Sequence, residues 1–185
     1  YGTVTGVQTC ALPISPMNEK KNRKIRSYVL RKGRLTPAQQ LALDELWPYY
    51  GIDNARTALD FDDYFERPAE VILDIGFGNG DSTWQMAQNE PEKNFIGIEV
   101  HEPGVGHLLM SLEKNDVSNV RIACTDAVEF MENRLGEGSV AGARIFFPDP
   151  WPKKRHHKRR IIQPAFVKLL ARCIRQGGIL HLATD

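Results

Sequence analysis

"VILDIGFGNG", residues 71–80, is the stretch that decides the fold. It opens on the mostly apolar run VILDI, which is typical of a buried β-strand, and continues with three alternating glycines at Gly76, Gly78 and Gly80. Glycine after a strand permits positive φ angles and lets a ligand approach the backbone closely. A strand that ends in such a turn is typical of an open α/β sheet.

From residue 70 onward, apolar runs alternate with segments of helical spacing. We expect strands at 71–76, 94–100, 120–126, 143–147 and 179–185, and helices at 81–90, 106–114, 127–134 and 161–176. Asp81 or Ser82 should cap the first of these helices, and Gly177-Gly178 should end the last. The alternation predicts an α/β fold with a Rossmann-like, doubly wound, mainly parallel sheet covered on both faces.

The sequence divides into three parts. Residues 1–16 show no strand or helix period and precede Met17, so we expect a non-native or disordered leader there. Residues 17–69 should form a basic N-terminal segment and a helix that packs beside the sheet, and residues 70–185 the α/β domain. Because the fifth predicted strand ends with the chain, we expect this domain to be truncated at its C-terminus.

The glycine turn also predicts a ligand. Its G-x-G-x-G spacing differs from the G-x-G-x-x-G of dinucleotide sites, whose third glycine packs helix on strand beneath a pyrophosphate. Asp74, just before the turn, disfavours a pyrophosphate and suits a cofactor with an amine and a sulfonium, which is S-adenosylmethionine. The glycines alone are a weak signal, because a plain tight turn has the same composition.

Four acids fall at the carboxyl ends of the first four predicted strands: Asp74, Glu99, Asp126 and Asp149. This is the edge at which open α/β sheets bind ligands. Glu99 suits the hydroxyls of a ribose, and Asp126 suits an adenine amino group. Since D-A-V-E also resembles a capping box, a helix cap is the alternative role for Asp126, and the two roles are compatible. Asp149 lies between two prolines, which stiffen the backbone around its carboxylate.

The net charge of +1 conceals two basic segments. Residues 20–34 hold eight Lys/Arg and residues 153–160 hold six, without an acid in either, which leaves ten basic against 23 acidic residues elsewhere. Either run alone fits a solvated surface, but the pair, with Tyr28 and Trp151 nearby, indicates a polyanionic partner. Trp151 fits a stacking platform for a flipped base and, equally, a side chain packed on the sheet edge.

Several classes of protein are disfavoured. No apolar run approaches the roughly 20 residues of a membrane span, so we expect no membrane association. The three cysteines form no C-x-x-C pair, which argues against a disulfide framework or a zinc ribbon and for the reducing cytoplasm. His156 and His157 stand among six cations, so we expect no metal site. We expect a monomer or homodimer without an obligate protein partner.

Six stretches together resemble the bacterial tRNA (guanine-N7)-methyltransferase family: IRSYVLRKGRLTPAQQ, IGFGNG, NFIGIEVHEPGVG, FFPDPWPKKRHHKRR, IIQPAF and HLATD. The resemblance covers about residues 25–185, and FPDPW with its basic continuation is the most specific part. It implies a class I methyltransferase fold, S-adenosylmethionine as the methyl donor, and guanine 46 in the variable loop of tRNA as the acceptor.

By position, the resemblance implies that all four acids contact the cofactor and that Asp149 is the catalytic residue. Lys153 and Asp185 match positions that bind the substrate, and we expect Lys154 and Arg155 to bind tRNA phosphates beside them.

Two residues depart from the family's pattern. Asp74 stands where many relatives have Glu, and Pro152 stands where many have His. A shorter acid at residue 74 reaches less far toward a cofactor.

Three alternatives remain at this stage. A nicotinamide dehydrogenase shares the fold but not the glycine spacing, and it leaves the basic segments unexplained. An exocyclic-amine methyltransferase uses a D/N-P-P-aromatic turn, whereas Trp151 here is the second residue after the acid. An RNA-binding protein with a degenerate methyltransferase fold is harder to exclude, although the presence of all four acids argues against degeneracy.

Overall fold

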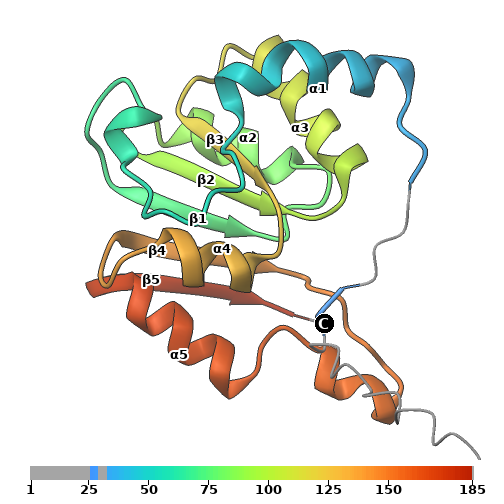
Figure 1. Ribbon diagram of the computed structural model, residues 1–185, viewed down its shortest axis with the longest axis vertical. Coiled ribbons are helices and arrows are strands. Elements are labelled where there is room, and N and C mark those ends of the chain that lie inside the picture. The colour runs from blue at the N-terminus through green and yellow to red at the C-terminus, as the bar shows by residue number, and fades with distance from the viewer. Residues whose placement is uncertain (1–25, 29–32, 185) are drawn as a thin grey trace, which may run out of the picture.

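The computed structural model describes residues 26–28 and 33–184, and within them a parallel five-stranded sheet forms the centre of the molecule (Figure 1). The strands lie in the order β3-β2-β1-β4-β5. Their bounds are β1 Val71–Ile75, β2 Asn94–Glu99, β3 Val120–Cys124, β4 Val140–Phe146 and β5 Ile174–Ala183. The chain starts at the centre, builds one half outward and returns to build the other, which confirms the doubly wound topology. The predicted leader, residues 1–16, lies outside the described residues.

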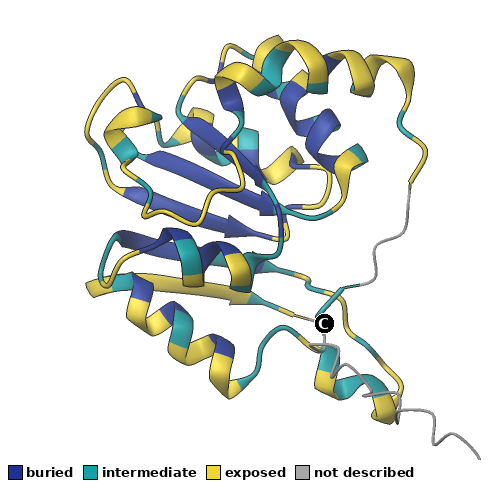
Figure 2. Ribbon diagram, in the orientation of Figure 1, coloured by how far each residue is buried: buried dark blue, intermediate teal, exposed yellow. Residues whose placement is uncertain are grey.

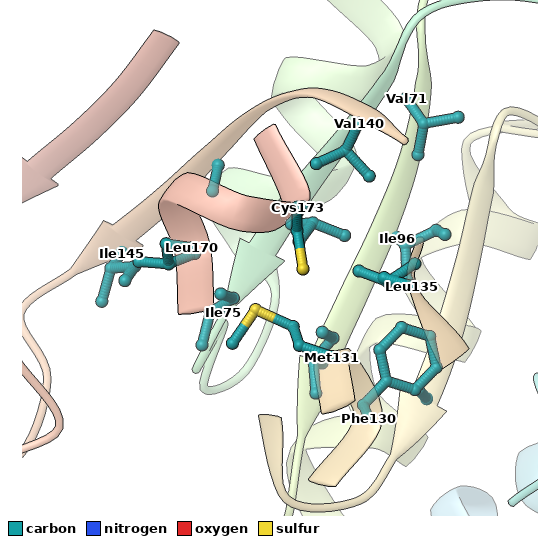
Figure 3. Close-up of a cluster of buried hydrophobic side chains, with 14 of the residues drawn as sticks. Val71, Ile75, Ile96, Phe130, Met131, Leu135, Val140, Ile145, Leu170 and Cys173 are labelled. Carbon is teal, nitrogen blue, oxygen red and sulfur yellow. The ribbon is translucent and has the colours of Figure 1, made fainter. Parts of the chain in front are cut away.

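Helices cover both faces of the sheet (Figure 1). They are α1 Pro37–Tyr50, α2 Asp81–Asn89, α3 Glu102–Lys114, α4 Ala127–Arg134 and α5 Pro164–Cys173. On one face Ile75 packs with Phe130 of α4 and Leu170 of α5 (Figure 3). On the other, Ile72 belongs to a cluster with Leu108 of α3. No helix of the described residues has both the length and the apolar character that crossing a membrane requires.

The helix expected within residues 35–69 is α1. A capping box starts it, because Thr36 Oγ1 accepts from the N–H of Gln39 and the Gln39 side chain accepts from the N–H of Thr36. Ala42 and Tyr50 are buried in the same cluster as the apolar residues of α3. The helix therefore packs beside the sheet through α3.

Strand β5 differs from the expectation of a sheet covered on both faces. The central strands are buried, whereas β5 is largely exposed (Figure 2). Ile179 is 73% exposed and Leu180 is 37% exposed. Within the described residues β5 pairs with β4 alone, and α5 is the helix that packs on it. The apolar residues of β5 therefore do not indicate that this strand is buried.

Helix α2 begins at Asp81 as predicted but has a different N-cap, and helix α3 begins earlier than predicted. Gly80 is the N-cap of α2 with φ of 80°, and no side chain caps this helix, so neither Asp81 nor Ser82 has that role. The glycine turn already ends in the left-handed region, and the helix follows from it directly. Helix α3 begins at Glu102, with Pro103 in its first turn, rather than at residue 106.

The predicted end of α5 is also wrong. The helix ends at Cys173, and Gly177 and Gly178 lie inside β5. Gly177 has φ of 78°, and a Cβ at Gly178 would come within 2.6 Å of the carbonyl oxygen of Ala141. The register between β4 and β5 shifts at this place. The glycine pair therefore marks a β-bulge rather than a helix terminus.

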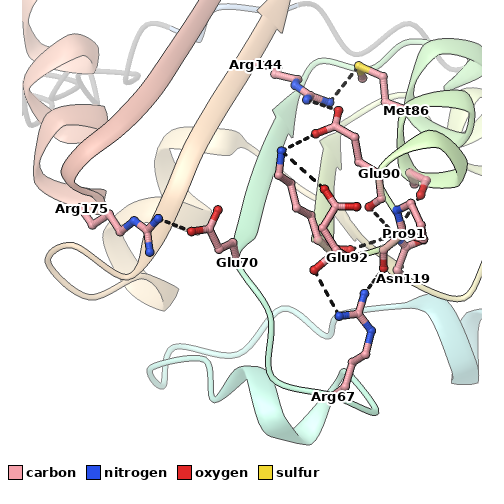
Figure 4. A network of polar contacts seen from close by, with 11 residues as sticks. Arg67, Glu70, Met86, Glu90, Pro91, Glu92, Asn119, Arg144 and Arg175 are labelled. Atoms are coloured by element: carbon pink, nitrogen blue, oxygen red, sulfur yellow. Dashed lines mark hydrogen bonds and ion pairs between the residues drawn. The ribbon is translucent and has the colours of Figure 1, made fainter.

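Ion pairs and hydrogen bonds join the elements away from the carboxyl edge of the sheet (Figure 4). Arg144 of β4 donates to Glu90 Oε1 at 2.5 Å, and Lys93 donates to Glu90 Oε2 at 2.6 Å. Burial opposes ionisation of Glu90, but these two hydrogen bonds outweigh it and lower its pKa. Arg175, at the start of β5, pairs with Glu70, just before β1. These contacts support the scaffold and leave the carboxyl edge free for the site.

Candidate active site

The carboxyl ends of the strands border a cavity of about 430 Å³. Four residues proposed from the sequence line it: Gly76, Gly78, Glu99 and Asp149. Six others do not line it: Asp74, Gly80, Asp126, Lys153, Lys154 and Arg155. The last candidate, Asp185, lies outside the described residues. The structure thus brings the ends of β1, β2 and β4 together around one cavity.

The glycine turn between β1 and α2 is open to this cavity. The φ angles of Gly76, Gly78 and Gly80 are 74°, 62° and 80°, a region that residues with a Cβ rarely adopt. A Cβ added to Gly76 or Gly78 would have no heavy atom within 4 Å, so a ligand has room beside this backbone. A Cβ on Gly80 would lie 2.8 Å from the Leu108 side chain. The third glycine therefore serves the packing of the turn on α3.

Glu99, the last residue of β2, holds the glycine turn. Its Oε2 accepts from the backbone N–H of Gly78 at 3.0 Å. Its Oε1 accepts from the N–H groups of Val100 at 2.7 Å and His101 at 3.0 Å. An ionised carboxylate has about four acceptor positions, so these bonds leave about one for a ligand hydroxyl. Glu99 joins the loops after β1 and β2 at the cavity wall.

Asp74 lies beneath the glycine turn, away from the cavity. It is 2% exposed, and its Oδ2 accepts from Thr83 Oγ1 of α2 at 2.7 Å. Burial raises the pKa of Asp74, while the Thr83 hydrogen bond and nearby Arg144 oppose that rise. In this position the carboxylate ties β1 to the first turn of α2.

Asp126 caps α4. Its Oδ1 accepts from the backbone N–H of Val128 at 2.9 Å and of Glu129 at 3.1 Å, which confirms the helix-cap interpretation. Its neighbours Thr125 and Ala127 line the cavity. Because both capping bonds go to the same oxygen, the cap and a contact to a bound ligand are compatible.

Asp149 lies on an exposed turn after β4. Phe147 and Trp151, two residues to either side, have φ of 48° and 42°, which is uncommon for bulky residues and costs roughly 1–3 kcal/mol each. The N–H of Phe147 donates to the carbonyl of Ala183 at 2.8 Å. Strand β4 ends at Phe146, so the predicted strand 143–147 is one residue too long at this end, and Phe147 itself is 65% exposed. Backbone strain on both sides of an acid at a cavity is typical of a functional turn.

Trp151 contacts protein on several sides. Its indole N–H donates to the carbonyl oxygen of Ser27 at 2.8 Å. The guanidinium carbon of Arg159 lies 5.1 Å from the centre of the ring, and the His156 ring meets it edge-on at 5.6 Å. The side chain also lines the cavity. Trp151 is therefore packed against the basic segment and against Ser27, near the N-terminus.

Ser27 and Tyr28 line the cavity as well, and sequence reasoning did not identify them as cavity residues. Hydrophobic periodicity reports local structure, whereas Ser27 and Trp151 are 124 residues apart in the chain. The signal that does contain them is the stretch IRSYVLRKGRLTPAQQ, one of the six on which the family resemblance rests.

The basic segment after Asp149 forms a 3₁₀ helix, η2 Lys154–Arg159, with Lys153 as its N-cap. Lys153, Lys154 and Arg155 are all exposed. Partial burial and the cations around it lower the pKa of His156. Exposed cations without neighbouring acids attract a polyanion and bind its phosphates. The segment therefore places positive charge beside the turn that carries Asp149.

Solved structures share this fold. The chain resembles the crystal structure of the 16S rRNA methyltransferase KamB, with a TM-score of 0.53 and 16% identity over 68% of this chain and 57% of that one. It also resembles the structure of an antibiotic-related methyltransferase, with a TM-score of 0.53 and 20% identity over 72% of this chain and 65% of the other. The architecture is that of a class I methyltransferase.

Sequence comparison gives the particular family. The family described as "Putative methyltransferase" matches residues 68–185. A protein of Xanthomonas campestris pv. campestris (strain 8004) is 51% identical over 94% of this chain and 67% of its own length. A protein of Aeromonas hydrophila subsp. hydrophila is 56% identical over 88% of this chain and 69% of its own length. Both are named tRNA (guanine-N(7)-)-methyltransferase. This chain belongs to the tRNA (guanine-N(7)-)-methyltransferase family, and it spans about two thirds of these relatives' length.

Proposed function

We propose that the protein transfers a methyl group from S-adenosylmethionine to N7 of guanine 46 in the variable loop of tRNA. The observation that carries the proposal is the position of Asp149, which lies on the wall of the cavity and is followed, five residues on, by the basic helix η2. The names of the relatives support the same reaction on tRNA. We place this activity in the cytoplasm, in a monomer or homodimer.

The cavity fits the cofactor. Its volume of about 430 Å³ lies within the range of roughly 300–1,000 Å³ that is usual for small-molecule sites. The backbone of Gly76 and Gly78 is open on the cavity side, and Glu99 retains acceptor capacity for a ribose hydroxyl. When bound, S-adenosylmethionine supplies an electrophilic methyl group on a sulfonium. We propose that the glycine turn, Glu99 and Asp149 hold it, with Asp126 near the adenine and Asp74 supporting the turn from below.

The reaction requires little acid–base chemistry from the protein. Guanine N7 is an unprotonated acceptor on the Hoogsteen edge, so no general base has to remove a proton from it. Positioning is the main contribution, and for well-oriented reactants it supplies at most about 7–11 kcal/mol. We propose that the Asp149 carboxylate accepts from the N1–H and N2–H groups of guanine and favours the positive charge that develops on the purine.

The basic helix η2 supplies affinity for the tRNA backbone. Lys153, Lys154 and Arg155 are exposed and lie within a few residues of Asp149. Contacts to phosphates fix the orientation of a nucleic acid without reading its sequence. The choice of guanine therefore rests on Asp149 and the cavity, and the strength of binding rests on the cations.

A methylation assay tests the proposal. The protein is incubated with methyl-labelled S-adenosylmethionine and a tRNA transcript, and the nucleosides are separated after digestion. We expect labelled 7-methylguanosine, and we expect none from a transcript that carries 7-deazaguanosine at position 46, because that base lacks the N7 acceptor. Binding of tRNA without label in either transcript would instead favour an RNA-binding protein, and label in both would place the methyl group elsewhere.

A further inference from the structure

We propose that Trp151 is a positioning residue, which acts by holding residues 26–28 in the wall of the cavity. The expected effect on catalysis rests on the proposed function, whereas the contact between Trp151 and Ser27 does not depend on it. The indole N–H of Trp151 donates to the carbonyl oxygen of Ser27 at 2.8 Å. This contact joins two segments that are 124 residues apart in the chain.

The indole is itself held firmly in its orientation. Arg159 lies over the ring at 5.1 Å, and the His156 ring meets it edge-on at 5.6 Å. A cation over an aromatic face and an edge-to-face ring pair are both attractive arrangements. The backbone of Trp151 adopts φ of 42°, a conformation that persists only when surrounding contacts enforce it. The donor is therefore aimed at Ser27 by the turn and by η2 together.

Residues 26–28 contribute a wall of the cavity. Ser27 and Tyr28 line it together with Glu99 and Asp149. Burial raises the pKa of Tyr28, and the nearby Asp126 carboxylate adds to the rise, which agrees with a ring seated toward the α4 side of the site. The guanidinium of Arg26 lies 5.7 Å from the centre of the Tyr28 ring. Releasing this segment would remove the Tyr28 ring from the wall.

The chemistry of Trp151 allows a conservative test. An indole has one N–H donor and no acceptor, so Trp151→Phe removes the hydrogen bond and keeps an aromatic ring for Arg159 and His156. Loss of a neutral hydrogen bond should shift the docked population of residues 26–28 by about 2- to 10-fold. Trp84→Phe is the matched control, because Trp84 lies on α2 and packs in the cluster formed with α1 and α3.

The first measurement is the rate at which trypsin cleaves the Arg26–Ser27 bond in the otherwise unaltered protein without cofactor, followed by mass spectrometry. We expect Trp151→Phe to be cleaved about 2- to 10-fold faster than wild type and Trp84→Phe to be cleaved at the wild-type rate. Saturating S-adenosylhomocysteine should slow cleavage in wild type, since a ligand and the wall it contacts stabilise each other. Equal rates for Trp151→Phe and wild type would overturn the proposal.

The second measurement is turnover of tRNA. We expect Trp151→Phe to lower kcat several-fold and to leave the KM for tRNA within about twofold, because the exposed cations of η2 are unchanged. Trp151→Phe combined with Tyr28→Ala should be no slower than Tyr28→Ala alone, since both act through the same wall. Faster cleavage with unchanged kcat would refute the positioning role. Faster cleavage in a protein that never methylates tRNA would leave the contact standing and contradict the proposed function.

Discussion

The carboxylate of Glu99 accepts a hydrogen bond from the backbone N–H of Gly78 at 3.0 Å, and this bond joins the ends of β1 and β2. The glycine backbone faces open space on its cavity side, and the carboxylate holds it from the neighbouring strand. A flexible turn is thereby fixed before any ligand arrives, which reduces the ordering cost of binding.

Glu99→Gln should weaken both the fold and cofactor binding. The amide keeps one acceptor oxygen and turns an N–H₂ group toward backbone donors, so at least one of the three N–H groups loses its partner. We expect about 1–3 kcal/mol lower free energy of unfolding and at least tenfold weaker binding of S-adenosylhomocysteine by calorimetry. Glu45→Gln, on the exposed side of α1, is the control. Wild-type affinity in Glu99→Gln would show that the carboxylate is dispensable.

Gly78→Ala should lower the free energy of unfolding through its backbone conformation and lower cofactor affinity through its added methyl group. Gly78 has φ of 62°, and a Cβ there meets nothing within 4 Å. Alanine in the left-handed region costs about 1–2 kcal/mol, and its methyl group would project into the space beside the turn. Gly136→Ala is the matched control, since Gly136 also has open space and no positive φ. Equal melting temperatures and equal cofactor affinities for the two variants would contradict this account.

Asp74→Asn should stabilise the protein near neutral pH. Burial raises the folded-state pKa of Asp74 above the ordinary value of 3.8, so ionising this carboxyl costs stability at every pH above the folded pKa. The asparagine is neutral and can still accept from Thr83. Its advantage over wild type in denaturant unfolding should shrink as the pH falls through the folded pKa toward the ordinary value. If the stability advantage of Asp74→Asn over wild type grew as the pH falls, it would contradict a raised folded-state pKa for Asp74.

The same substitution separates the two roles considered for Asp74. Because Asp74 does not line the cavity, we expect Asp74→Asn to bind S-adenosylhomocysteine within about threefold of wild type. A loss as large as that of Glu99→Gln would mean that Asp74 contacts the cofactor directly, as its position before the glycine turn suggests.

Removing charge from η2 should weaken tRNA binding in a salt-dependent way. Each phosphate contact contributes about 0.7–0.9 to the slope of log K against log salt concentration. We therefore expect Lys154→Ala and Arg155→Ala each to flatten that slope by up to this amount, in filter binding over a range of salt. Lys168→Ala, exposed on α5, provides the comparison. Unchanged slopes in the η2 variants would place the tRNA elsewhere.

Much of the fold could be predicted from the sequence because local patterns encode it. The apolar run of β1 and the spacing of α4 appear in the structure with almost the predicted bounds. Glycine was harder to interpret, because Gly80 and Gly177 look alike in the sequence. The first ends a turn and caps α2, while the second lies in a bulge of β5. Pairing between β4 and β5 decides the second case, and no local pattern contains that information.

The sequence indicated at which edge of the sheet the candidate site lies, but not which of the acids there line the cavity. Asp74 and Glu99 are both acids at strand ends, yet Asp74 is 2% exposed beneath the turn and Glu99 lines the cavity. The direction of the Asp74 side chain depends on the packing of α2, because its carboxylate accepts a hydrogen bond from Thr83 of that helix. The contact between Trp151 and Ser27 depends on tertiary structure alone, so periodicity could not reveal it.

The most direct test of the central claim is Asp149→Asn. The asparagine would turn an amide toward the guanine N1–H and remove the negative charge, so the rate of methyl transfer in a single turnover should fall by at least about 100-fold. The dissociation constant for tRNA should stay within a few fold of wild type, because the exposed cations after Asp149 are unchanged, as should that of the exposed control Asp63→Asn. A wild-type rate, or a loss of binding as large as the loss of rate, would contradict a catalytic role for this carboxylate.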